Sequence, residues 1–223
     1  MSDFTGRTVV VTGGSGALGA GLAAAFSDAG ADVVGVDRAA PDERAIVDGV
    51  RYETADLTDD ASVSALFDAV GTPWAVVNTV GGFAPKSPLS ELDPEELEKQ
   101  LHLNLMTAAV VTKHALRVME PVGAGRIVLT ASKAATATSS NGFAYSVSKL
   151  AVLHLARMAS EEVAGTGITV NSVVPSIIDT PANRASMPDA DHDRWPKISD
   201  LAQVYVFLAS PSSGAVNGAA LPV

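Results

Sequence analysis

The sequence predicts an α/β fold: a doubly wound parallel sheet of about seven strands with helices on both faces. Short runs rich in valine and isoleucine alternate with longer helical stretches along the chain, which is the order of a parallel sheet. The strand-like runs are largely apolar rather than alternating, as expected for strands covered on both faces. Because no linker, repeat or low-complexity tract interrupts this order, we expect a single domain over residues 1–223.

The elements follow one another in a regular order. The expected strands are the short apolar runs 8–12, 32–36, 51–53, 75–78, 126–130, 169–174 and 219–223. The expected helices are the longer stretches 17–29, 60–70, 94–119, 142–163 and 199–208. The least regular stretch, 179–197, is polar and contains three prolines, which favours a surface flap after the sixth strand.

Composition argues against several classes of protein. No uninterrupted apolar run approaches the roughly 20 residues that a membrane-spanning helix needs, and the N-terminus has no apolar run of signal-peptide type. We therefore expect a soluble, cytoplasmic protein. The chain has no cysteine, which excludes disulfides and thiolate metal sites, and its four histidines are dispersed, so we expect no structural metal. The net charge of −10 argues against a nucleic-acid partner.

A glycine-rich segment stands between the first expected strand and the first expected helix. It runs Gly14-Ser15-Gly16-Ala17-Leu18-Gly19 and fits the pattern G-x-G-x-x-G. Such a loop lets the backbone approach a pyrophosphate closely, and the free N–H groups and dipole of the following helix attract the negative charge. A P-loop is a poorer fit because no G-K-[ST] follows, and a purely structural glycine turn is the remaining interpretation.

Asp37 and Arg38 close the second expected strand. Asp37 lies 18 residues after Gly19, where a carboxylate accepts hydrogen bonds from an adenosine ribose and repels a 2′-phosphate, so NAD(H) is favoured. Arg38 leaves NADP(H) open, because an arginine here accommodates that phosphate. Asp37 as a simple turn residue is the alternative. Asp56 and Leu57, after the third strand, are expected to border the adenine, unless Asp56 caps the helix that follows.

Tyr145 and Lys149 lie four residues apart in an expected helix and therefore share one face. A tyrosine is a poor acid–base group at neutral pH, but a nearby lysine charge together with an oxidised nicotinamide would lower its pKa. Ser132, at the end of the fifth strand, would hold a substrate carbonyl or imine while Tyr145 transfers the proton. Lys133 is left out of this set, because a continuing strand would point it to the opposite face. Alone, Y-x-x-x-K also occurs on ordinary solvated helix faces.

Together these motifs resemble the short-chain dehydrogenase/reductase family, which has a single Rossmann-like domain, and the resemblance covers nearly the whole chain. The family segment T-G-x-x-x-[AG]-x-G corresponds to Thr12-Gly13 through Ala17 and Gly19. The family tetrad Asn–Ser–Tyr–Lys falls on Asn104, Ser132, Tyr145 and Lys149. The family's N-N-A-G appears as Asn78-Thr79-Val80-Gly81, which keeps the first Asn and the Gly.

The resemblance implies further roles for single residues. Asn104 is expected to break its helix locally and to anchor a water in a proton relay through Lys149 and the cofactor ribose. Thr180 matches the threonine that contacts the nicotinamide carboxamide, and Ser176 replaces the family's glycine after Pro175. The expected cofactor-binding residues are Gly13, Ser15, Gly16, Ala17, Leu18, Gly19, Asp37, Arg38, Asp56, Leu57, Asn78, Gly81, Tyr145, Lys149, Pro175 and Thr180.

Several segments are similar to the dihydropteridine reductase branch of that family, among them GGSGALG, VGGFA and DTPANRASMPDADHDRW. That branch reduces a quinonoid dihydropterin with NADH, which agrees with Asp37. Members of the branch have alanine where this chain keeps Ser132, which leaves a carbonyl or alcohol substrate open. We therefore expect an NAD(H)-dependent oxidoreductase for a small carbonyl, alcohol or cyclic imine. A ketone or 3-oxoacyl reductase using NADP(H) and a non-catalytic dinucleotide sensor are the alternatives.

The flap at 179–197 is expected to close over the substrate if the resemblance holds. The candidate substrate-lining residues are Phe83, Asn183, Arg184, Met187 and Trp195. An ordinary surface loop that Trp195 packs down, with Phe83 in the core, is the alternative. The helices 94–119 and 142–163 carry many small and apolar residues, and in relatives the same helices pair across the interface of a homodimer or homotetramer.

Overall fold

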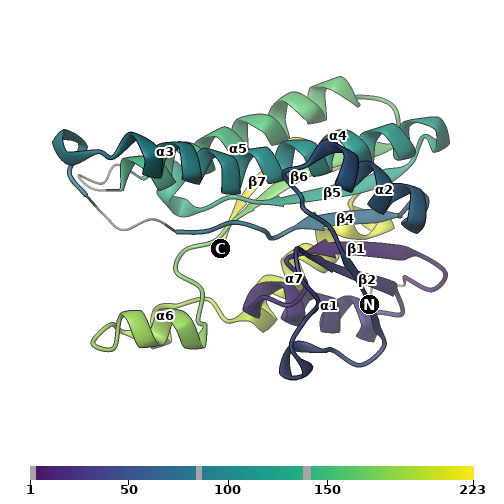
Figure 1. Cartoon of the computed structure of the whole chain (residues 1–223). Coiled ribbons are helices and arrows are strands. Elements are labelled where there is room, and N and C mark those ends of the chain that lie inside the picture. Colours follow the sequence, from purple (N-terminus) through teal and green to yellow (C-terminus); the bar gives the residue numbers. More distant parts are fainter. Residues whose placement is uncertain (1–3, 84–86, 138–141) are drawn as a thin grey trace.

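The computed structural model describes residues 4–83, 87–137 and 142–223. Its centre is a sheet of 7 parallel strands in the order β3-β2-β1-β4-β5-β6-β7 (Figure 1). The strands are β1 (Thr8–Thr12), β2 (Asp32–Asp37), β3 (Val50–Thr54), β4 (Ala75–Asn78), β5 (Gly125–Thr130), β6 (Ile168–Val174) and β7 (Ala220–Pro222). The Rossmann-like fold class expected from the sequence is confirmed.

The order of the strands reverses at β1. β2 and β3 lie on one side of β1, and β4 pairs with its other side, so that Val10 stands in register with Val34 on β2 and Val76 on β4. A reversal of this kind leaves a crevice beyond the carboxyl ends of the strands, because the connections that follow the two central strands leave in opposite directions. The loops after β1, β4 and β5 therefore meet at one edge of the sheet.

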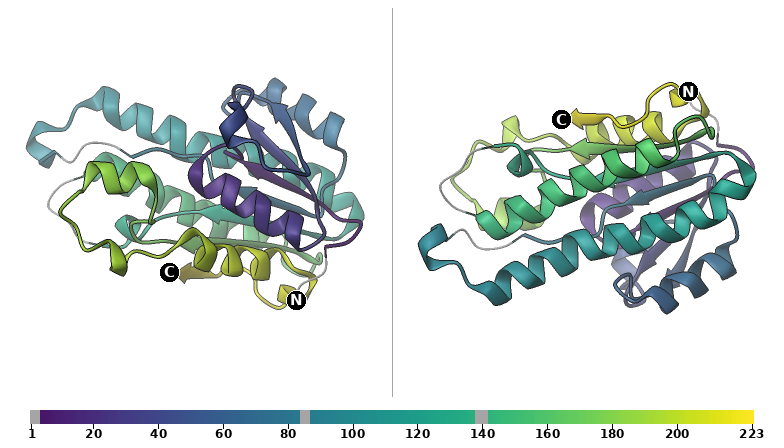
Figure 2. Two further views of the ribbon diagram at one scale, coloured as in Figure 1. Left: turned by 90° about the horizontal axis from the view of Figure 1, so that it is seen from below. Right: turned by 90° about the horizontal axis from the view of Figure 1, so that it is seen from above.

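Helices cover both faces of the sheet. They are α1 (Ala17–Asp28), α2 (Asp60–Val70), α3 (Pro94–Gln100), α4 (Thr107–Met119), α5 (Phe143–Glu162), α6 (Pro181–Ser186) and α7 (Ile198–Ala209). α1 and α7 contact each other on one face, whereas α2, α4 and α5 form a layer on the other (Figure 2). α6 belongs to the flap and stands apart from both layers (Figure 1).

Each face of the sheet has its own apolar core. Successive residues of β1 point to opposite faces, so Val9 and Val11 pack with Phe26 of α1, and Val10 packs with the helices of the opposite layer. Phe4 lies edge-on against Phe26, with ring centroids 5.3 Å apart. The strands read as continuous apolar runs because both of their faces are buried.

The expected helix over 94–119 is wrong as a single element. α3 ends at Gln100, a π-helical stretch spans Leu101–Met106, and α4 begins at Thr107. A π-helical turn closes its hydrogen bonds over one more residue than an α-helical turn and often marks a functional position. The local break that the family resemblance implied at Asn104 falls inside this stretch. The other expected elements agree with the structure to within one residue at each end.

The flap contains a helix that the sequence analysis did not anticipate. α6 is six residues long, its N-cap Thr180 accepts a hydrogen bond from the N–H of Asn183 at 3.2 Å, and Pro181 occupies its first position. A 3₁₀ turn follows at His192–Arg194. The interpretation of 179–197 as irregular is therefore corrected for these two segments, whose capping residues were visible but whose length is too short for periodicity to detect.

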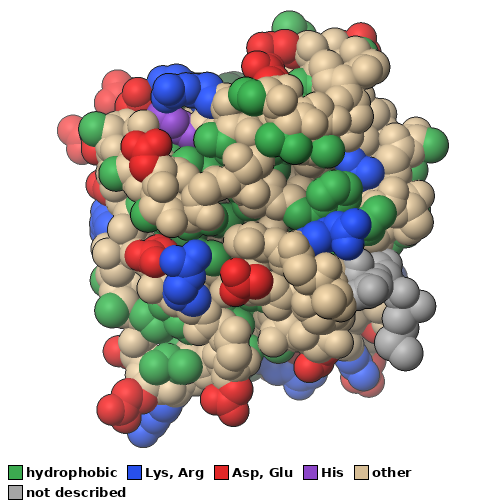
Figure 3. All heavy atoms as spheres, turned by 90° about the vertical axis from the view of Figure 1, so that its right-hand side faces the viewer, with side chains coloured by type: hydrophobic (Ala, Val, Ile, Leu, Met, Phe, Trp, Pro, Cys, Tyr) green, Lys and Arg blue, Asp and Glu red, His purple; other side chains and the backbone are tan. Residues whose placement is uncertain are grey.

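Charged side chains of both signs are interspersed on the face of the molecule shown in Figure 3. Within the described ranges, no helix has the length and apolar character needed to cross a membrane.

Glycines bring helix α1 into direct contact with the loop after β1. A Cβ added at Gly19 would overlap the carbonyl oxygen of Gly13, and one at Gly14 would lie 2.7 Å from the Cα of Gly35 on β2. Gly13 itself has a φ of 72°, a conformation that glycine adopts without steric cost. The loop and the helix start are therefore packed backbone against backbone.

Gly19→Ala is expected to destabilise the fold, because its methyl group must push the Gly13 peptide out of place. The expected loss is about 1–3 kcal/mol, the usual cost of overpacking, measured by urea unfolding without dinucleotide. Gly16→Ala is the matched control from the same loop: Gly16 has φ −73° and ψ 161°, and its added Cβ would lie 3.3 Å from the Gly13 oxygen. Equal stability of the two variants would contradict the close packing of α1.

Candidate active site

The start of α1 can receive an anion. Gly16 is its N-cap, and, within the part of the chain that the structure describes, no side chain caps its first turn and no acidic residue lies there. The first N–H groups of a helix have no partner inside the helix, and together with the helix dipole they attract phosphate. Gly16 is exposed at this helix start and carries no side chain, so the loop fits the pyrophosphate of a dinucleotide.

Asp37 lies directly against the glycine-rich loop. Its Oδ2 accepts a hydrogen bond from the N–H of Ser15 at 2.7 Å, which joins the end of β2 to the loop after β1. Arg38, the next residue, is exposed. The structure therefore places the Asp37 carboxylate against the glycine-rich loop, with the exposed Arg38 next to it in the chain.

Asp56 does not cap the helix that follows it, so that alternative is wrong. Its carboxylate accepts hydrogen bonds from the hydroxyl and the N–H of Thr58 at 2.7 and 3.0 Å, and Asp59 is the N-cap of α2. The hydrogen bond from the Thr58 hydroxyl is the largest cause of the lowered pKa of Asp56, and the charge of Arg38 adds to it. Leu57 is buried. Asp56 and Arg38 thus lie near one another beyond β2 and β3.

Ser132 and Tyr145 are brought together at the carboxyl end of β5. Ser132 is the N-cap of a 3₁₀ turn, and its Oγ accepts a hydrogen bond from the N–H of Ala134 at 3.2 Å. Burial raises the pKa of Tyr145, and the hydrogen bond with Ser132 offsets part of this rise. β5 ends at Thr130, so the argument from a continuing strand does not apply to Lys133, which is exposed on the turn.

Lys149 lies on the same helix as Tyr145 and is only 5% exposed. Its Nζ donates a hydrogen bond to the carbonyl oxygen of Thr130 at 3.0 Å. Burial lowers the pKa of Lys149 to about 8. In the chain alone, burial therefore favours the neutral forms of both Tyr145 and Lys149, which is opposite in direction to the lowered tyrosine pKa expected with an oxidised nicotinamide.

Asn104 lies inside the π-helical stretch and is buried. Its Oδ1 accepts a hydrogen bond from the N–H of Gly82 at 3.0 Å, and its Nδ2 donates to the hydroxyl of Ser148 at 3.0 Å. A Cβ added at Gly81 would lie 2.5 Å from Asn104 Oδ1 and 2.8 Å from Lys149 Nζ. Asn104, Lys149 and the loop after β4 therefore meet at one point.

Asn78 and Pro175, which were also expected to bind the cofactor, and the neighbouring Ser176 lie at or just after the carboxyl ends of β4 and β6. Asn78 is buried, and its Oδ1 accepts a hydrogen bond from the hydroxyl of Thr12, so its side chain joins β4 to β1. The carbonyl of Pro175 accepts a hydrogen bond from the N–H of Lys133 at 2.9 Å. Ser176 needs no special backbone, because glycines alone have positive φ among the described residues.

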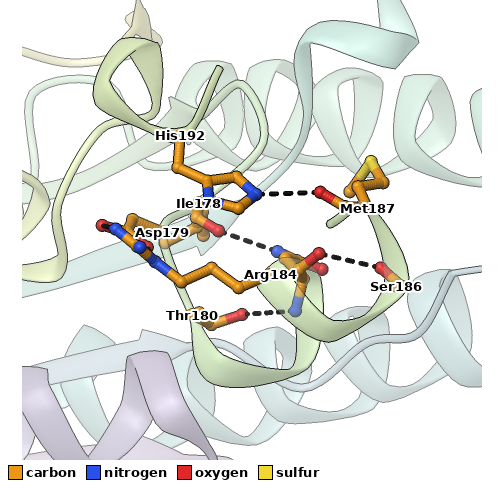
Figure 4. A network of polar contacts seen from close by, with 8 residues as sticks. Ile178, Asp179, Thr180, Arg184, Ser186, Met187 and His192 are labelled. Atoms are coloured by element: carbon orange, nitrogen blue, oxygen red, sulfur yellow. Dashed lines mark hydrogen bonds and ion pairs between the residues drawn. The ribbon is translucent and has the colours of Figure 1, made fainter. Parts of the chain in front are cut away.

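The flap is held by its own polar contacts, which Figure 4 shows. Arg184 forms two hydrogen bonds with Asp179, from Nε to Oδ1 at 2.5 Å and from Nη2 to Oδ2 at 2.8 Å. The side-chain amide of Asn183 donates to the carbonyl of Ile178 at 2.8 Å. At the base of the flap, the N–H of Asp179 donates to the carbonyl of Pro196 at 3.0 Å. Two distant points of the chain therefore meet where the flap begins and ends.

The aromatic candidates lie in two places. Trp195 packs against His192 within the flap, with ring centroids 4.5 Å apart, and His192 in turn bonds the carbonyl of Met187. Phe83 is 64% exposed and lies edge-on against Tyr145, with ring centroids 5.1 Å apart. Phe83 as a core residue is thus wrong, whereas Trp195 does pack the flap together.

Sequence reasoning missed three residues that support this site. Gln100 and Ser148 both accept hydrogen bonds from the Asn104 amide, and the Thr130 carbonyl holds the Lys149 ammonium. Gln100 stands four residues before Asn104 and Ser148 one before Lys149, but a polar side chain at these positions is equally common on a solvated helix face.

Lys149→Met is expected to change how stability depends on pH. Between about pH 8 and 10.5 the folded chain binds fewer protons at Lys149 than the unfolded chain, so the free energy of unfolding rises with pH there. At pH 7 we expect the variant to be more stable by roughly 2 kcal/mol, with the difference shrinking toward pH 10. Urea unfolding at both pH values measures this, and a constant difference would contradict burial as the cause of the low pKa.

Known proteins match this chain along almost its full length. The family model described as Enoyl-(Acyl carrier protein) reductase matches residues 13–223. A cis-4-hydroxycyclohexanecarboxylate dehydrogenase from Sinomonas cyclohexanicum is 33% identical over 238 residues, covering 99% of this chain and 96% of the relative.

Solved structures agree with this relationship. A short-chain type dehydrogenase/reductase from Mycobacterium ulcerans superposes with a TM-score of 0.91 and 31% identity, covering 99% of this chain and 89% of that one. A gluconate 5-dehydrogenase from Burkholderia cenocepacia J2315 in complex with NADP and tartrate gives a TM-score of 0.88 and 27% identity, covering 99% and 94%. With its parallel sheet, glycine-rich loop and Ser132–Tyr145–Lys149 edge, the chain belongs to the short-chain dehydrogenase/reductase family of NAD(P)-dependent oxidoreductases.

Proposed function

We propose that this enzyme uses NAD(H) to interconvert a secondary alcohol and a ketone on a small cyclic substrate. The observation that carries the proposal is the meeting of Ser132, Tyr145 and Lys149 at the edge of the sheet that also holds the glycine-rich loop. These groups supply a hydrogen-bond donor, a proton donor and a positive charge, which together are what carbonyl reduction requires.

The residues divide the proton chemistry among them. The nicotinamide supplies or takes up hydride at its C4 when bound. Ser132 and the Tyr145 hydroxyl hold the substrate oxygen, and Tyr145 donates its proton to that oxygen during reduction. Burial keeps Tyr145 protonated beforehand, which suits an acid in this direction. Lys149, four residues away on the same helix, stabilises the phenolate that remains.

Asp37 is the reason to favour NAD(H) over NADP(H). Its carboxylate already lies within hydrogen-bond distance of Ser15 in the glycine-rich loop, so a ribose on that loop would meet an acceptor and a 2′-phosphate would meet a like charge. Arg38 stands beside it and is near Asp56, whose carboxylate it partly neutralises. We assign the cofactor set expected from the sequence to this edge, with Tyr145 and Lys149 next to the nicotinamide ribose.

Phe83 and Arg184 support the choice of substrate. Phe83 is exposed and edge-on to Tyr145, so it forms an apolar wall beside the reacting oxygen for a flat or cyclic molecule. Arg184, paired with Asp179 in the flap, is a cation that a substrate carboxylate could engage. The relative from Sinomonas cyclohexanicum is named for a substrate with both features, a ring alcohol and a carboxylate. Asn183, Met187 and Trp195 shape the same flap.

One screen that follows the oxidation of NADH and NADPH tests the proposed substrate class against the alternatives. Quinonoid dihydropterin tests the similarity to the dihydropteridine reductase branch, and 3-oxoacyl thioesters with NADPH test the reductase alternative. Dinucleotide binding without turnover of any carbonyl, alcohol or imine would favour the sensor. Reduction of cyclic ketones would support the proposal.

We further propose that two copies of the chain associate through α4 and α5. A groove of about 360 Å³ lies between these helices, lined by residues that include Leu116, Leu155 and Met158. Met158 is 58% exposed in the single chain. The same groove is also lined by Lys113, Arg117, Glu120 and Glu162, so a second copy meeting it in an isologous contact would find both apolar surface and charges of both signs.

Asp37→Ser is expected to weaken NADH binding by roughly tenfold, because a charged hydrogen-bond acceptor for the ribose is lost. NADPH binding should become tighter as the like charge is removed. Calorimetry of both cofactors measures the change, with Asp32→Ser as control, since Asp32 is exposed at the opposite end of the same strand. Tighter binding of NADPH than NADH by the parent chain would overturn the role given to Asp37.

Tyr145→Phe is expected to lower turnover by about 10²–10⁴-fold, the usual contribution of a positioned acid or base. The ring and its contact with Phe83 are retained, so NADH affinity should change little. Tyr52→Phe is the matched control, because the Tyr52 hydroxyl bonds the backbone of Ala45 and Val47 away from the site. Unchanged turnover in Tyr145→Phe would remove Tyr145 from its role.

A further inference from the structure

Three polar side chains follow one another along α3 and the π-helical stretch. Glu96, Gln100 and Asn104 are spaced by four residues and stand on one face. Gln100 and Asn104 are each 1% exposed, and the side chain of Glu96 is 26% exposed. A fully buried glutamine is uncommon, since long polar side chains remain at the surface unless their hydrogen bonds are satisfied.

The hydrogen bonds along this row have one possible direction. An ionised carboxylate only accepts, so Gln100 must turn its Nε2 toward Glu96 Oε1, at 2.8 Å. The Oε1 of Gln100 then faces Asn104 and accepts from its Nδ2 at 2.9 Å. The Asn104 Oδ1 is thereby turned toward the N–H of Gly82, at 3.0 Å. The charge of Glu96 thus sets the orientation of the Gln100 amide. The Asn104 amide is set by Gln100 together with the Gly82 peptide, whose carbonyl also accepts from Asn104 Nδ2 at 3.2 Å.

A reversed Asn104 amide would not fit the loop after β4. Its Nδ2 would face the N–H of Gly82, so two donors would meet and the Gly82 amide would lose its acceptor. The Asn104 Oδ1 is also the atom that a Cβ at Gly81 would approach, next to Lys149 Nζ. A change in this amide therefore acts on the wall against which the lysine is packed.

The same amide contacts the catalytic helix. Asn104 Nδ2 donates to Ser148 Oγ at 3.0 Å, and the Ser148 hydroxyl donates to the carbonyl of Tyr145 at 2.8 Å. Ser148 is fully buried between Tyr145 and Lys149 in sequence. The orientation of Asn104 is thus shared by the loop after β4 and by the helix that carries the proton donor.

We propose that Glu96 and Gln100 are positioning residues of the active site, which hold the Asn104 amide in the orientation that the Gly81–Gly82 loop and Lys149 require. Glu96 supplies the charge that fixes the direction, and Gln100 transmits it through two hydrogen bonds. The effect on catalysis rests on the proposed function, whereas the effect on the Gly82 amide does not.

The test first reverses the direction of the hydrogen bonds along Glu96, Gln100 and Asn104, and then restores it. Glu96→Lys replaces an acceptor with a donor, so Gln100 must turn its Oε1 toward the lysine and its Nε2 toward Asn104. We expect a loss of about tenfold in kcat, the value of one misdirected hydrogen bond, and faster hydrogen exchange of the Gly82 amide. Glu98→Lys, with the same change of charge on an exposed position of α3, is the control and should behave as the parent.

The Glu96→Lys/Gln100→Glu double variant restores the direction. The introduced carboxylate at position 100 accepts from the new lysine and from Asn104 Nδ2, so kcat and the protection of the Gly82 amide should return to within about twofold of the parent.

The two readouts separate the failure of this inference from the failure of the proposed function. Parent-like kcat and Gly82 exchange in Glu96→Lys, or a double variant no better than Glu96→Lys, would overturn the positioning role. If the parent chain turns over no substrate of the screen, the proposed function fails, and Gly82 exchange alone then decides whether Glu96 and Gln100 orient Asn104.

Discussion

The carboxyl ends of β1, β4 and β5 are joined by a row of side-chain hydrogen bonds, and the site depends on this connection. The Thr12 hydroxyl bonds Asn78 on β4, and the Thr130 hydroxyl donates to the Asn78 carbonyl at 2.7 Å. Since the Thr130 proton is used there, the Tyr205 hydroxyl of α7 must donate to Thr130, at 2.8 Å. Lys149 reaches the carbonyl of the same Thr130 from α5, in the other layer of helices. Thr130 thus connects α7 on one face of the sheet to Lys149 of α5 on the other.

Burial of polar groups is the energetic cost of this arrangement. Lys149 and Asn104 are almost completely buried, and Tyr145 has its pKa raised by burial. Each is satisfied by a hydrogen bond to a backbone or side-chain group, which limits the cost of removing it from water. The same low exposure strengthens the interaction of the lysine charge with any phenolate beside it, because water does not screen the pair.

Much of the fold could be predicted from local sequence patterns. The places where the structure differs from those predictions have physical reasons. Apolar runs bounded by polar residues located every strand, and the glycine spacing together with Asp37 located the loop and the carboxylate beside it. The family resemblance implied a break at Asn104, but the local pattern did not show the π-helical form of Leu101–Met106, because α- and π-helical turns bury nearly the same face over six residues. Asp56 and Asp59 were equally good caps by residue type, and only the turn geometry chose Asp59. The burial of Gln100 depends on the packing of α3 against α5, a helix from a later segment of the chain.

The flap is closed at its neck by the hydrogen bond from the Asp179 N–H to the Pro196 carbonyl, so its two ends lie side by side. Its internal bonds, including the Thr180 cap and the Arg184 pair, are made within the loop itself. Residues between the two ends can therefore be replaced without disturbing the packing of the sheet, so substitutions are expected to be tolerated there better than in the strands.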